Sequence, residues 1–404
     1  MDPRQFDFTR RKWHWHNLPP EIAARLAEEA SADELICVKA TDTRAVYKFE
    51  NLFIKVSGSL RIKAQLYPAA RQEFEVSCKL QEQNINTVKH LGWGRSGHYT
   101  ALITEAWTDD AIDALYYWYS LIYEMKDPTV FLDQLALFLQ NTVNSRLKHE
   151  DFHLGNILYS PSCGEFTLVD LHNVSLGPEH TFSSRAEMLQ ILAELRGGLQ
   201  PQDLLDMFWK SANIDSTTAA RVIHRKLVRD MERTNHDWAR RLKQFLHGYG
   251  KFSDFVMFDN QTLLVQRNKL RKNLFDPAAA SRGAYRKIRL AFPAALEQML
   301  FSFYLSLLQV PHVPVAALAP NGTLYYPQLP ESFQIPEDRE QVNSYNEYLL
   351  CMGLYLENYQ QLRSCLHTKQ LLVTDFSSML AAMPNRSMFQ PEKVDPRTWR
   401  VRRR

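Results

Sequence analysis

One stretch near the middle of the chain, residues 149–172, constrains the fold and the chemistry more than any other. It begins His-Glu-Asp-Phe-His-Leu-Gly-Asn-Ile-Leu and ends, after a short turn, in Phe-Thr-Leu-Val-Asp-Leu-His. Asp151 and Asn156 stand five residues apart, and an apolar pair follows at once. Asp170 ends a second short apolar run. The pattern predicts a polar loop with a further carboxylate downstream, at the end of a strand.

These three polar side chains suit phosphoryl transfer. One carboxylate must accept the proton of an attacking hydroxyl, and oxygen ligands must hold Mg²⁺ against the phosphates. Protein kinases place an Asp and an Asn five apart in a loop and a second Asp at a strand end downstream. On that pattern Asp151 is the catalytic base, and Asn156 and Asp170 are the magnesium ligands. The alternative is that all three residues only form turns, which leaves their joint match with His149 unexplained.

Composition sets the class of protein and its compartment. The chain has 404 residues, 45% of them hydrophobic, which favours a globular protein of two domains. A net charge of +3 is too small to indicate nucleic acid as a partner. The five cysteines lack metal-ligand spacing and favour a reduced compartment. The N-terminus lacks a signal-peptide core, and the longest apolar run, residues 299–308, is too short to span a bilayer. We therefore expect a cytoplasmic protein that attaches at most to a membrane surface.

A small lobe rich in strands is predicted over residues 33–105. Its first three strands are expected at residues 35–38, 45–49 and 52–56. Lys55 lies inside the third strand, where an ammonium is costly to bury without an anionic partner. In kinase-like sites a lysine at this place meets the nucleotide phosphates and a helix glutamate. The alternative is an edge-strand lysine that faces water.

The glutamate that would pair with Lys55 is expected on the next helix, residues 69–81. Glu73 falls on the same helical face as Leu80, which predicts that it points inward. Glu75 lies on a different side of the helix. We therefore expect Glu73 to order the phosphates together with Lys55.

A second hairpin is predicted over residues 87–104, with its turn region at residues 92–94. It leads into Glu105 and Trp107, the expected hinge between lobes, where adenine would bind. The sequence has no glycine-rich loop between the first two strands. The backbone of the turn at residues 41–44 would then have to cover the phosphates.

Helices are predicted for the large lobe, residues 106–255. The first, residues 128–147, carries an apolar repeat at helical spacing and delivers the chain into the polar loop. His149 and His153 are expected to be structural and to brace that loop through a backbone carbonyl or Asp170. A zinc site from these two histidines alone lacks further ligands at a suitable spacing.

The two ends of the chain are expected to differ from this kinase-like middle. Residues 1–32 form an arm and a short helix, with a basic aromatic cluster that could lie on anionic lipid or pack on a lobe. Residues 256–404 are expected to form a further unit, a mostly helical extension. Its order of strand, helix and hairpin resembles that of residues 52–104, so it could be a degenerate second small lobe. The basic tail, residues 397–404, is expected to be mobile.

The motifs resemble those of the lipopolysaccharide core kinases, which include the heptose and 3-deoxy-manno-octulosonic acid (Kdo) kinases of Gram-negative bacteria. Asp170-Leu171-His172, where protein kinases carry Asp-Phe-Gly, is the most pointed likeness. The other similar segments are residues 149–158, 53–55, 71–73, 102–105 and 241–249. The resemblance covers residues 33–255. It implies an α+β, bilobal protein-kinase-like fold, with ATP and Mg²⁺ as cofactors. It also implies a lipid-linked or soluble sugar acceptor.

Two departures from this family, and three functions, remain open. Glu150 stands where an Arg is common, and the C-terminal unit lies outside the usual length of the family. The chain could be a kinase that phosphorylates lipopolysaccharide core at the inner face of the cytoplasmic membrane. It could instead be a small-molecule kinase with another acceptor, because that wider group shares the motif. The third function is a kinase-fold regulatory protein without turnover, favoured by the missing glycine-rich loop and opposed by intact Asp151, Asn156 and Asp170.

Overall fold

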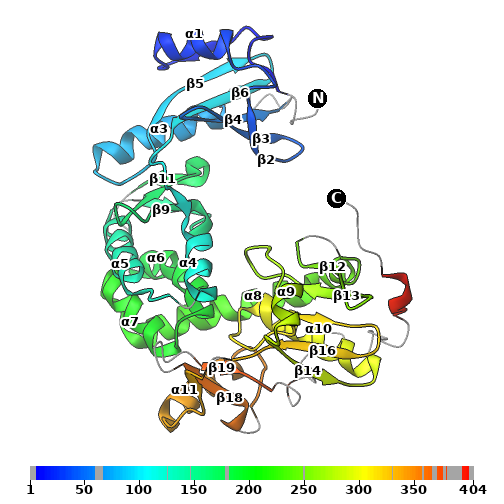
Figure 1. Ribbon diagram of the computed structural model, residues 1–404. Helices are drawn as coiled ribbons and strands as arrows, with labels where there is room; N and C mark the ends of the chain where they lie inside the picture. Colours follow the sequence, from blue (N-terminus) through cyan, green and yellow to red (C-terminus); the bar gives the residue numbers. More distant parts are fainter. Residues whose placement is uncertain are drawn as a thin grey trace. The chain divides into compact units, whose positions relative to one another are not determined.

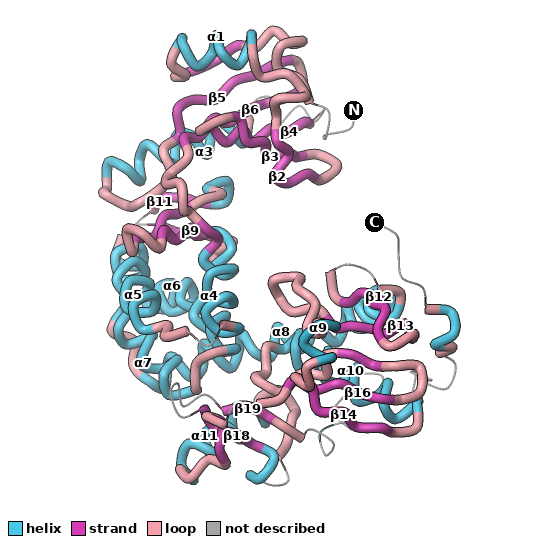
Figure 2. The backbone as a smooth tube through the Cα atoms, in the orientation of Figure 1, coloured by secondary structure: helices cyan, strands magenta, loops and turns pink. Residues whose placement is uncertain are grey.

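The computed structural model folds into two compact units, which are described separately (Figures 1 and 2). The first comprises Met1–Tyr117, Thr129–Ile191 and Lys210–Ala212, and the second comprises Trp118–Pro128, Leu192–Trp209 and Asn213–Arg404. The residues that the structure describes are 6–59, 67–124, 126–145, 147–177, 182–248, 251–329, 331–356, 359–365, 371–375, 379 and 394–399. The expected domain boundary at residue 255 does not coincide with a boundary between these units.

A six-stranded antiparallel sheet forms the small lobe at the start of the first unit, drawn in blue in Figure 1. In spatial order its strands are β1 (His14–His16), β5 (His90–Ser96), β6 (Tyr99–Glu105), β4 (Leu52–Gly58), β3 (Arg44–Phe49) and β2 (Ile36–Ala40). The expected strands at residues 45–49 and 52–56 lie within β3 and β4. Helix α3 (Ala69–Glu82) packs Ala70 and Phe74 against Leu102 on one face of the sheet. The alternating side chains of the central strands therefore give the sheet two buried faces.

The other face of the sheet is covered by the N-terminal arm and helix α1 (Pro20–Glu28). Phe6 and Phe8 are buried there against Tyr47 and its neighbours in the sheet. Trp13 and Trp15 are partly buried and stack with ring centroids 5.0 Å apart. Of the two expectations for the arm, the described residues therefore show the one in which it packs on a lobe.

The expected turn at residues 92–94 is wrong, because Gly92 and Gly94 lie inside β5. The turn of the hairpin falls at Gly97, whose φ is +60°. Strand β1 pairs with β5, and the Trp15 ring occupies the space where a side chain on Gly94 would stand. These glycines allow the arm to pack closely against β5 and do not form a turn. A local sequence pattern cannot distinguish these two uses of glycine.

The remainder of the first unit supports the polar loop. Helix α5 (Thr129–Asn144) buries Phe131, Leu135, Phe138 and Leu139, so the expected helix is present but three residues shorter at its C-terminal end. Two antiparallel strand pairs follow it. Strand β8 (Leu147–His149) pairs with β11 (Val174–Leu176), and β9 (Ile157–Ser160) pairs with β10 (Glu165–Leu168). Strand β7 (Ile112–Asp113) extends the second pair. Helix α6 (Phe182–Met188) also belongs to this unit, whereas helix α4 (Ala114–Tyr123) contributes residues to both units.

The second unit contains long helices and a sheet of its own. Helix α7 (Pro201–Ala212) contributes residues to both units, and the long helix α8 (Ser216–Leu246), which is rich in Arg and Lys, follows it. Five antiparallel strands then form a sheet, in the spatial order β12 (Ser253–Phe258), β13 (Gln261–Gln266), β15 (Ala317–Leu318), β16 (Thr323–Pro327) and β14 (Tyr285–Arg289). Helices α9 (Pro277–Ser281), α10 (Phe292–Leu308) and α11 (Arg339–Leu350) accompany it, with a small sheet of β17 (Phe333–Gln334), β18 (Leu362–Cys365) and β19 (Leu371–Val373).

This C-terminal sheet stands beside the helices of the expected extension, residues 256–404. Its strands and α10 follow one another in the expected order of strand, helix and hairpin. The pairing of these elements also matches, because β14 and β15 both pair with β16, as β4 and β5 both pair with β6. The hairpin before them differs, because β13 pairs with β15, whereas β3 pairs with β4. The similarity to the small lobe therefore extends to the order and the pairing of these elements, and not to the hairpin that precedes them.

The basic tail is described only as far as Trp399, so residues 400–404 lie outside the described residues. Trp399 is buried, with its ring 5.7 Å from that of Phe255 and 5.8 Å from that of Phe292. This part of the tail is therefore packed, not mobile. Within the described part of the chain, no helix combines the length and apolar character needed to cross a membrane.

A substitution at Gly92 tests how the arm is held. A Cβ at Gly92 would lie 2.5 Å from the backbone nitrogen of Leu18 and 2.7 Å from the carbonyl oxygen of His16, so one of the two segments must move. We expect Gly92→Ala to lower the free energy of unfolding in urea by about 1–3 kcal/mol. It should also weaken the near-ultraviolet circular dichroism of the stacked tryptophans. Gly177→Ala is the control, because nothing lies within 4 Å of a Cβ there; equal stability of the two variants would contradict this account.

Candidate active site

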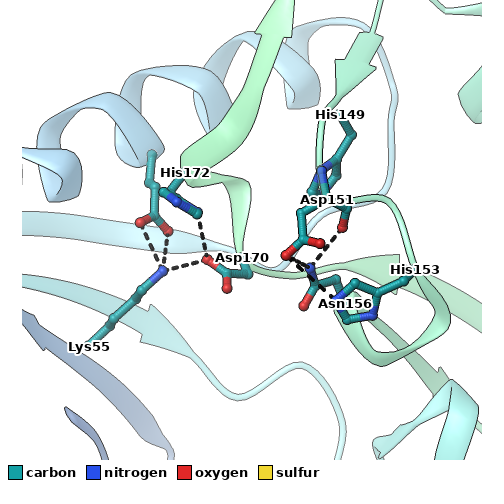
Figure 3. Close-up of polar contacts among 8 residues, drawn as sticks. Lys55, His149, Asp151, His153, Asn156, Asp170 and His172 are labelled. Atoms are coloured by element: carbon teal, nitrogen blue, oxygen red, sulfur yellow. Dashed lines mark hydrogen bonds and ion pairs between the residues drawn. The ribbon is translucent and has the colours of Figure 1, made fainter. Parts of the chain in front are cut away.

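Lys55 is the centre of a group of charged side chains in the first unit (Figure 3). It lies in β4, between Val46 of β3 and Leu102 of β6. Its ammonium nitrogen is 2.9 Å and 3.0 Å from the two carboxylate oxygens of Glu73 and 2.6 Å from Oδ1 of Asp170. The structure thus places Lys55 on an interior strand with two anionic partners, not at a water-facing edge.

Glu73 meets Lys55 because it lies on the inner face of α3. Its side chain is only 3% exposed, whereas Glu75 pairs at the surface with Arg71. Burial raises the pKa of Glu73, and the charge of Lys55 opposes that rise. A carboxylate in such a place depends on its cation, because an unpaired buried charge is strongly destabilising.

At Asp170 the neighbouring cations outweigh the effect of burial on the pKa, unlike at Glu73. Burial raises its pKa, but the charge of the Lys55 ammonium and the hydrogen bond from it outweigh burial, and His172 and Arg44 add to their effect. The net result is a pKa below the ordinary value of an aspartate. Asp170 is therefore a carboxylate at neutral pH, as a cation ligand must be.

The backbone at Asp170 is left-handed, with φ 58° and ψ 62°. Asp is one of the few residues with a side chain that adopts this conformation at modest cost. Asp170 follows β10 and precedes a short 3-10 helix, η3 (Leu171–Asn173). Nδ1 of His172 lies 3.4 Å from Oδ1 of Asp170. His172 was not among the expected site residues, although its place in the Asp170-Leu171-His172 triplet could have indicated it.

The polar loop that holds Asp151 is fixed at both ends by strand pairs. His149 pairs with Val174 across β8 and β11, and Ile157 pairs with Leu168 across β9 and β10. Inside the loop, the side-chain nitrogen Nδ2 of Asn156 donates to the backbone oxygen of Asp151 at 2.9 Å and lies 3.5 Å from Oδ2 of Asp151. Asn156 therefore sets the orientation of the segment that carries Asp151.

The two histidines of the loop accept hydrogen bonds from backbone amides. Nδ1 of the buried His149 accepts from the amide of Asp151 at 3.2 Å, and Nδ1 of His153 accepts from the amide of Gly155 at 3.0 Å. Burial lowers the pKa of His149 to about 4, so its ring is neutral and can accept at neutral pH. The expected brace through a carbonyl or Asp170 is thus replaced by bonds to amides. Nε2 of His153 also lies 3.6 Å from Oδ2 of Asp151.

Asp151 itself is open to solvent, with 59% of its side chain exposed. Figure 3 draws Asp170 between Lys55 on one side and the Asp151–Asn156 pair on the other. The site therefore has a buried half, in which Lys55, Glu73 and Asp170 are held by mutual attraction. Its other half is an accessible carboxylate that could take a proton from an approaching hydroxyl.

The expected adenine hinge lies at the end of β6. Glu105 pairs with Leu52, which places it about 10 Å along the strand direction from Lys55. Its carboxylate accepts from Lys89 at 2.8 Å, and its amide donates to the backbone oxygen of Lys89 at 2.9 Å. Trp107 follows and is partly exposed. Glu105 thus lies apart from the charged group, and its side chain is occupied by Lys89.

The oxygen atoms of Asp170 and Asn156 suit magnesium. One is a carboxylate and the other an amide, and this hard cation takes oxygen ligands of both kinds. Among the described residues, no group of three or more His, Cys, Asp or Glu gathers as a metal site. A cation held by Asp170 and Asn156 would therefore need phosphate and water oxygens to complete its shell.

Comparisons with known proteins give structural likeness only. No protein-family profile matches the chain, and no curated protein matches it. Among solved structures it resembles WaaP in complex with acyl carrier protein, at 16% identity and a TM-score of 0.38, over 57% of this chain and 98% of that chain. It resembles WbdD at 14% identity and a TM-score of 0.33, over 46% of this chain and 44% of that chain. A kinase domain gives 14% identity and a TM-score of 0.28, over 43% of this chain and 64% of that chain.

These scores are low, and the fold is assigned from the geometry described above. A sheet in which β4 pairs with β6, a helix α3 between β4 and β5, and the contacts of Lys55 with Glu73 and Asp170 form a protein-kinase-like arrangement. The α+β, protein-kinase-like fold expected from the motifs is therefore confirmed.

The charged group predicts a pattern of stability changes. Lys55→Met leaves Glu73 buried without its cation, and we expect a loss of about 3–5 kcal/mol in the free energy of unfolding. Lys55→Met/Glu73→Gln should lose clearly less than Lys55→Met alone, because the stranded charge is gone. Arg71→Met breaks the exposed pair with Glu75 and should cost no more than about 1 kcal/mol. Urea denaturation measures all three, and equal losses in the single and double variants would refute the role given to Glu73.

Proposed function

We propose that this chain is an ATP- and magnesium-dependent kinase that phosphorylates a sugar hydroxyl of lipopolysaccharide core, a heptose or Kdo. The observation that carries the kinase part is the contact of Lys55 with both Glu73 and Asp170, next to a loop in which Asn156 orients Asp151. Phosphoryl transfer depends almost entirely on positioning and on charge stabilisation, and these contacts supply both.

Each residue has a part in this proposal that follows from its surroundings. Asp151 is exposed and ionisable, so it can accept the proton of the acceptor hydroxyl. Asn156 holds the backbone of Asp151 through its amide nitrogen, which leaves its oxygen for the cation. Lys55 is kept in place by Glu73 and would meet the phosphates of ATP. Magnesium, when bound between Asp170 and Asn156, would offset the charge of those phosphates.

The acceptor is the less constrained part of the proposal. Its support is the resemblance of residues 149–158 and of the Asp170-Leu171-His172 triplet to lipopolysaccharide core kinases. A lipid-linked sugar would place the reaction at the inner face of the cytoplasmic membrane. Several basic residues of α8 that could face such a surface are already paired, since Lys226 contacts Asp230 and Arg240 contacts Asp237.

Substitution of the base tests the proposal directly. Asp151→Asn removes the proton acceptor while leaving the binding groups in place, so we expect transfer to fall about 10²–10⁴-fold with nucleotide affinity unchanged. The readout is phosphorus NMR of purified lipopolysaccharide core after incubation with ATP, magnesium and the protein. Asp109→Asn, an exposed aspartate nearby in the chain, is the matched control. Full transfer by Asp151→Asn would exclude it as the base, and transfer to a soluble sugar alone would favour the small-molecule kinase.

The cation ligands should differ in strength. Asp170 contributes a full charge and Asn156 only an amide dipole, so we expect Asp170→Ala to reduce magnesium-dependent nucleotide binding more than Asn156→Ala does. Titration calorimetry with ATP, with and without magnesium, measures the two losses. The reverse order, or equal losses without magnesium, would count against these assignments.

A further inference from the structure

A row of polar side chains crosses the small-lobe sheet just beyond Lys55. Arg44 of β3 is paired with Ser57 of β4, Ser57 with Thr100 of β6, and Thr100 with Arg95 of β5. Paired residues in neighbouring strands point to the same face of a sheet, and so do residues two apart in one strand. The four side chains therefore share a face with Lys55, one pleat farther along β4, at a spacing of about 7 Å.

This row lines a cavity of about 440 Å³ in the small lobe. Besides the four residues of the row, His98 and Ala69, the first residue of α3, contribute to its wall. The described lining thus contains two guanidinium groups, an imidazole and four hydroxyls, those of Thr43, Ser57, Ser59 and Thr100, and none of its residues is acidic. The cavity is a cationic one in a chain whose overall charge is nearly balanced.

The chemistry of this lining fits one class of ligand. Guanidinium groups bind phosphate oxygens in pairs of parallel hydrogen bonds, and hydroxyls complete the shell of a tetrahedral oxyanion. Ala69, the first residue of the 14-residue helix α3, also lies at the wall, so the positive end of that helix borders the cavity. The positive charge of Arg44 also reaches Asp170, where it contributes to the lowered pKa of that carboxyl.

We propose that this cavity, lined by Arg44, Ser57, Arg95 and Thr100, binds a phosphate group other than the one held by Lys55. That binding does not depend on catalysis, and only the source of the phosphate rests on the proposed function. One source is the terminal phosphate of the nucleotide, in which case Arg44 does the work of the missing glycine-rich loop. The other is a phosphate already present on the acceptor sugar.

The first test uses inorganic phosphate as the probe and requires no transfer. Its affinity for the full-length protein is measured by calorimetry in the wild type, Arg44→Gln and Arg95→Gln. Each substitution removes charge-assisted hydrogen bonds and should weaken phosphate binding about tenfold or more. Lys79→Gln removes the same charge from the exposed side of α3 and should leave binding unchanged. Arg44→Lys, which keeps the charge but loses the paired bonds, should fall between wild type and Arg44→Gln.

The second test identifies the source. If the cavity takes the terminal phosphate of the nucleotide, Arg44→Gln should weaken the imido analogue of ATP about tenfold and leave ADP unchanged. If it takes a phosphate of the acceptor, both nucleotides should bind to Arg44→Gln as they bind to the wild type. The variant should then lose affinity for phosphorylated lipopolysaccharide core and keep its affinity for the dephosphorylated form. Absence of phosphate binding, or an equal loss in Lys79→Gln, would overturn the proposal. Full transfer by Asp151→Asn would contradict the proposed function alone and leave phosphate binding unaffected, so the two failures are distinguishable.

Discussion

The attraction of one ammonium group for two carboxylates is the interaction on which the site depends. Lys55 is brought to the interior by the apolar alternation of β4, and an ammonium there needs anions. Glu73 supplies one from α3 and Asp170 the other from the segment after β10. Both α3 and the segment that follows β10 are thus held by contacts with the same atom, the ammonium nitrogen of Lys55. A second link joins the same parts, because the amide of Val88, beyond α3, donates to the backbone oxygen of Leu168 in β10.

The same arrangement divides the site into parts with different freedom. Lys55 and Glu73 are largely enclosed, so their geometry is set before any ligand arrives, and this preorganisation is what electrostatic catalysis requires. Asp151 is exposed, and its place is set by its backbone, whose amide donates to His149 and whose oxygen accepts from Asn156. Burial lowers the pKa of His149 to about 4, so its ring stays neutral and can accept this bond throughout the neutral range of pH. The loop therefore holds the carboxylate by its main chain and leaves the side chain accessible.

What the sequence predicted well depends on local or strongly constrained patterns. The spacing of Asp151, Asn156 and Asp170 and the inward face of Glu73 follow from loop and helix periodicity. What it missed depends on partners far along the chain. Gly92 lies in a strand because the arm packs over it, and β13 joins β15 across α10. Arg44 belongs to a cationic row only through the registers of four strands, and no single segment shows that.

The arm at residues 6–30 bears on the tendency of the small lobe to self-associate. Strand β1 occupies the free edge of β5, and the aromatic residues of the arm cover the outer face of the sheet. An uncovered strand edge beside an apolar face is the combination through which sheets of different molecules join. The arm thus covers an edge and a face through which molecules could otherwise associate, and we expect cleavage in this segment to promote association. The small lobe then carries charged side chains on the face that bears Lys55, while its apolar outer face stays covered.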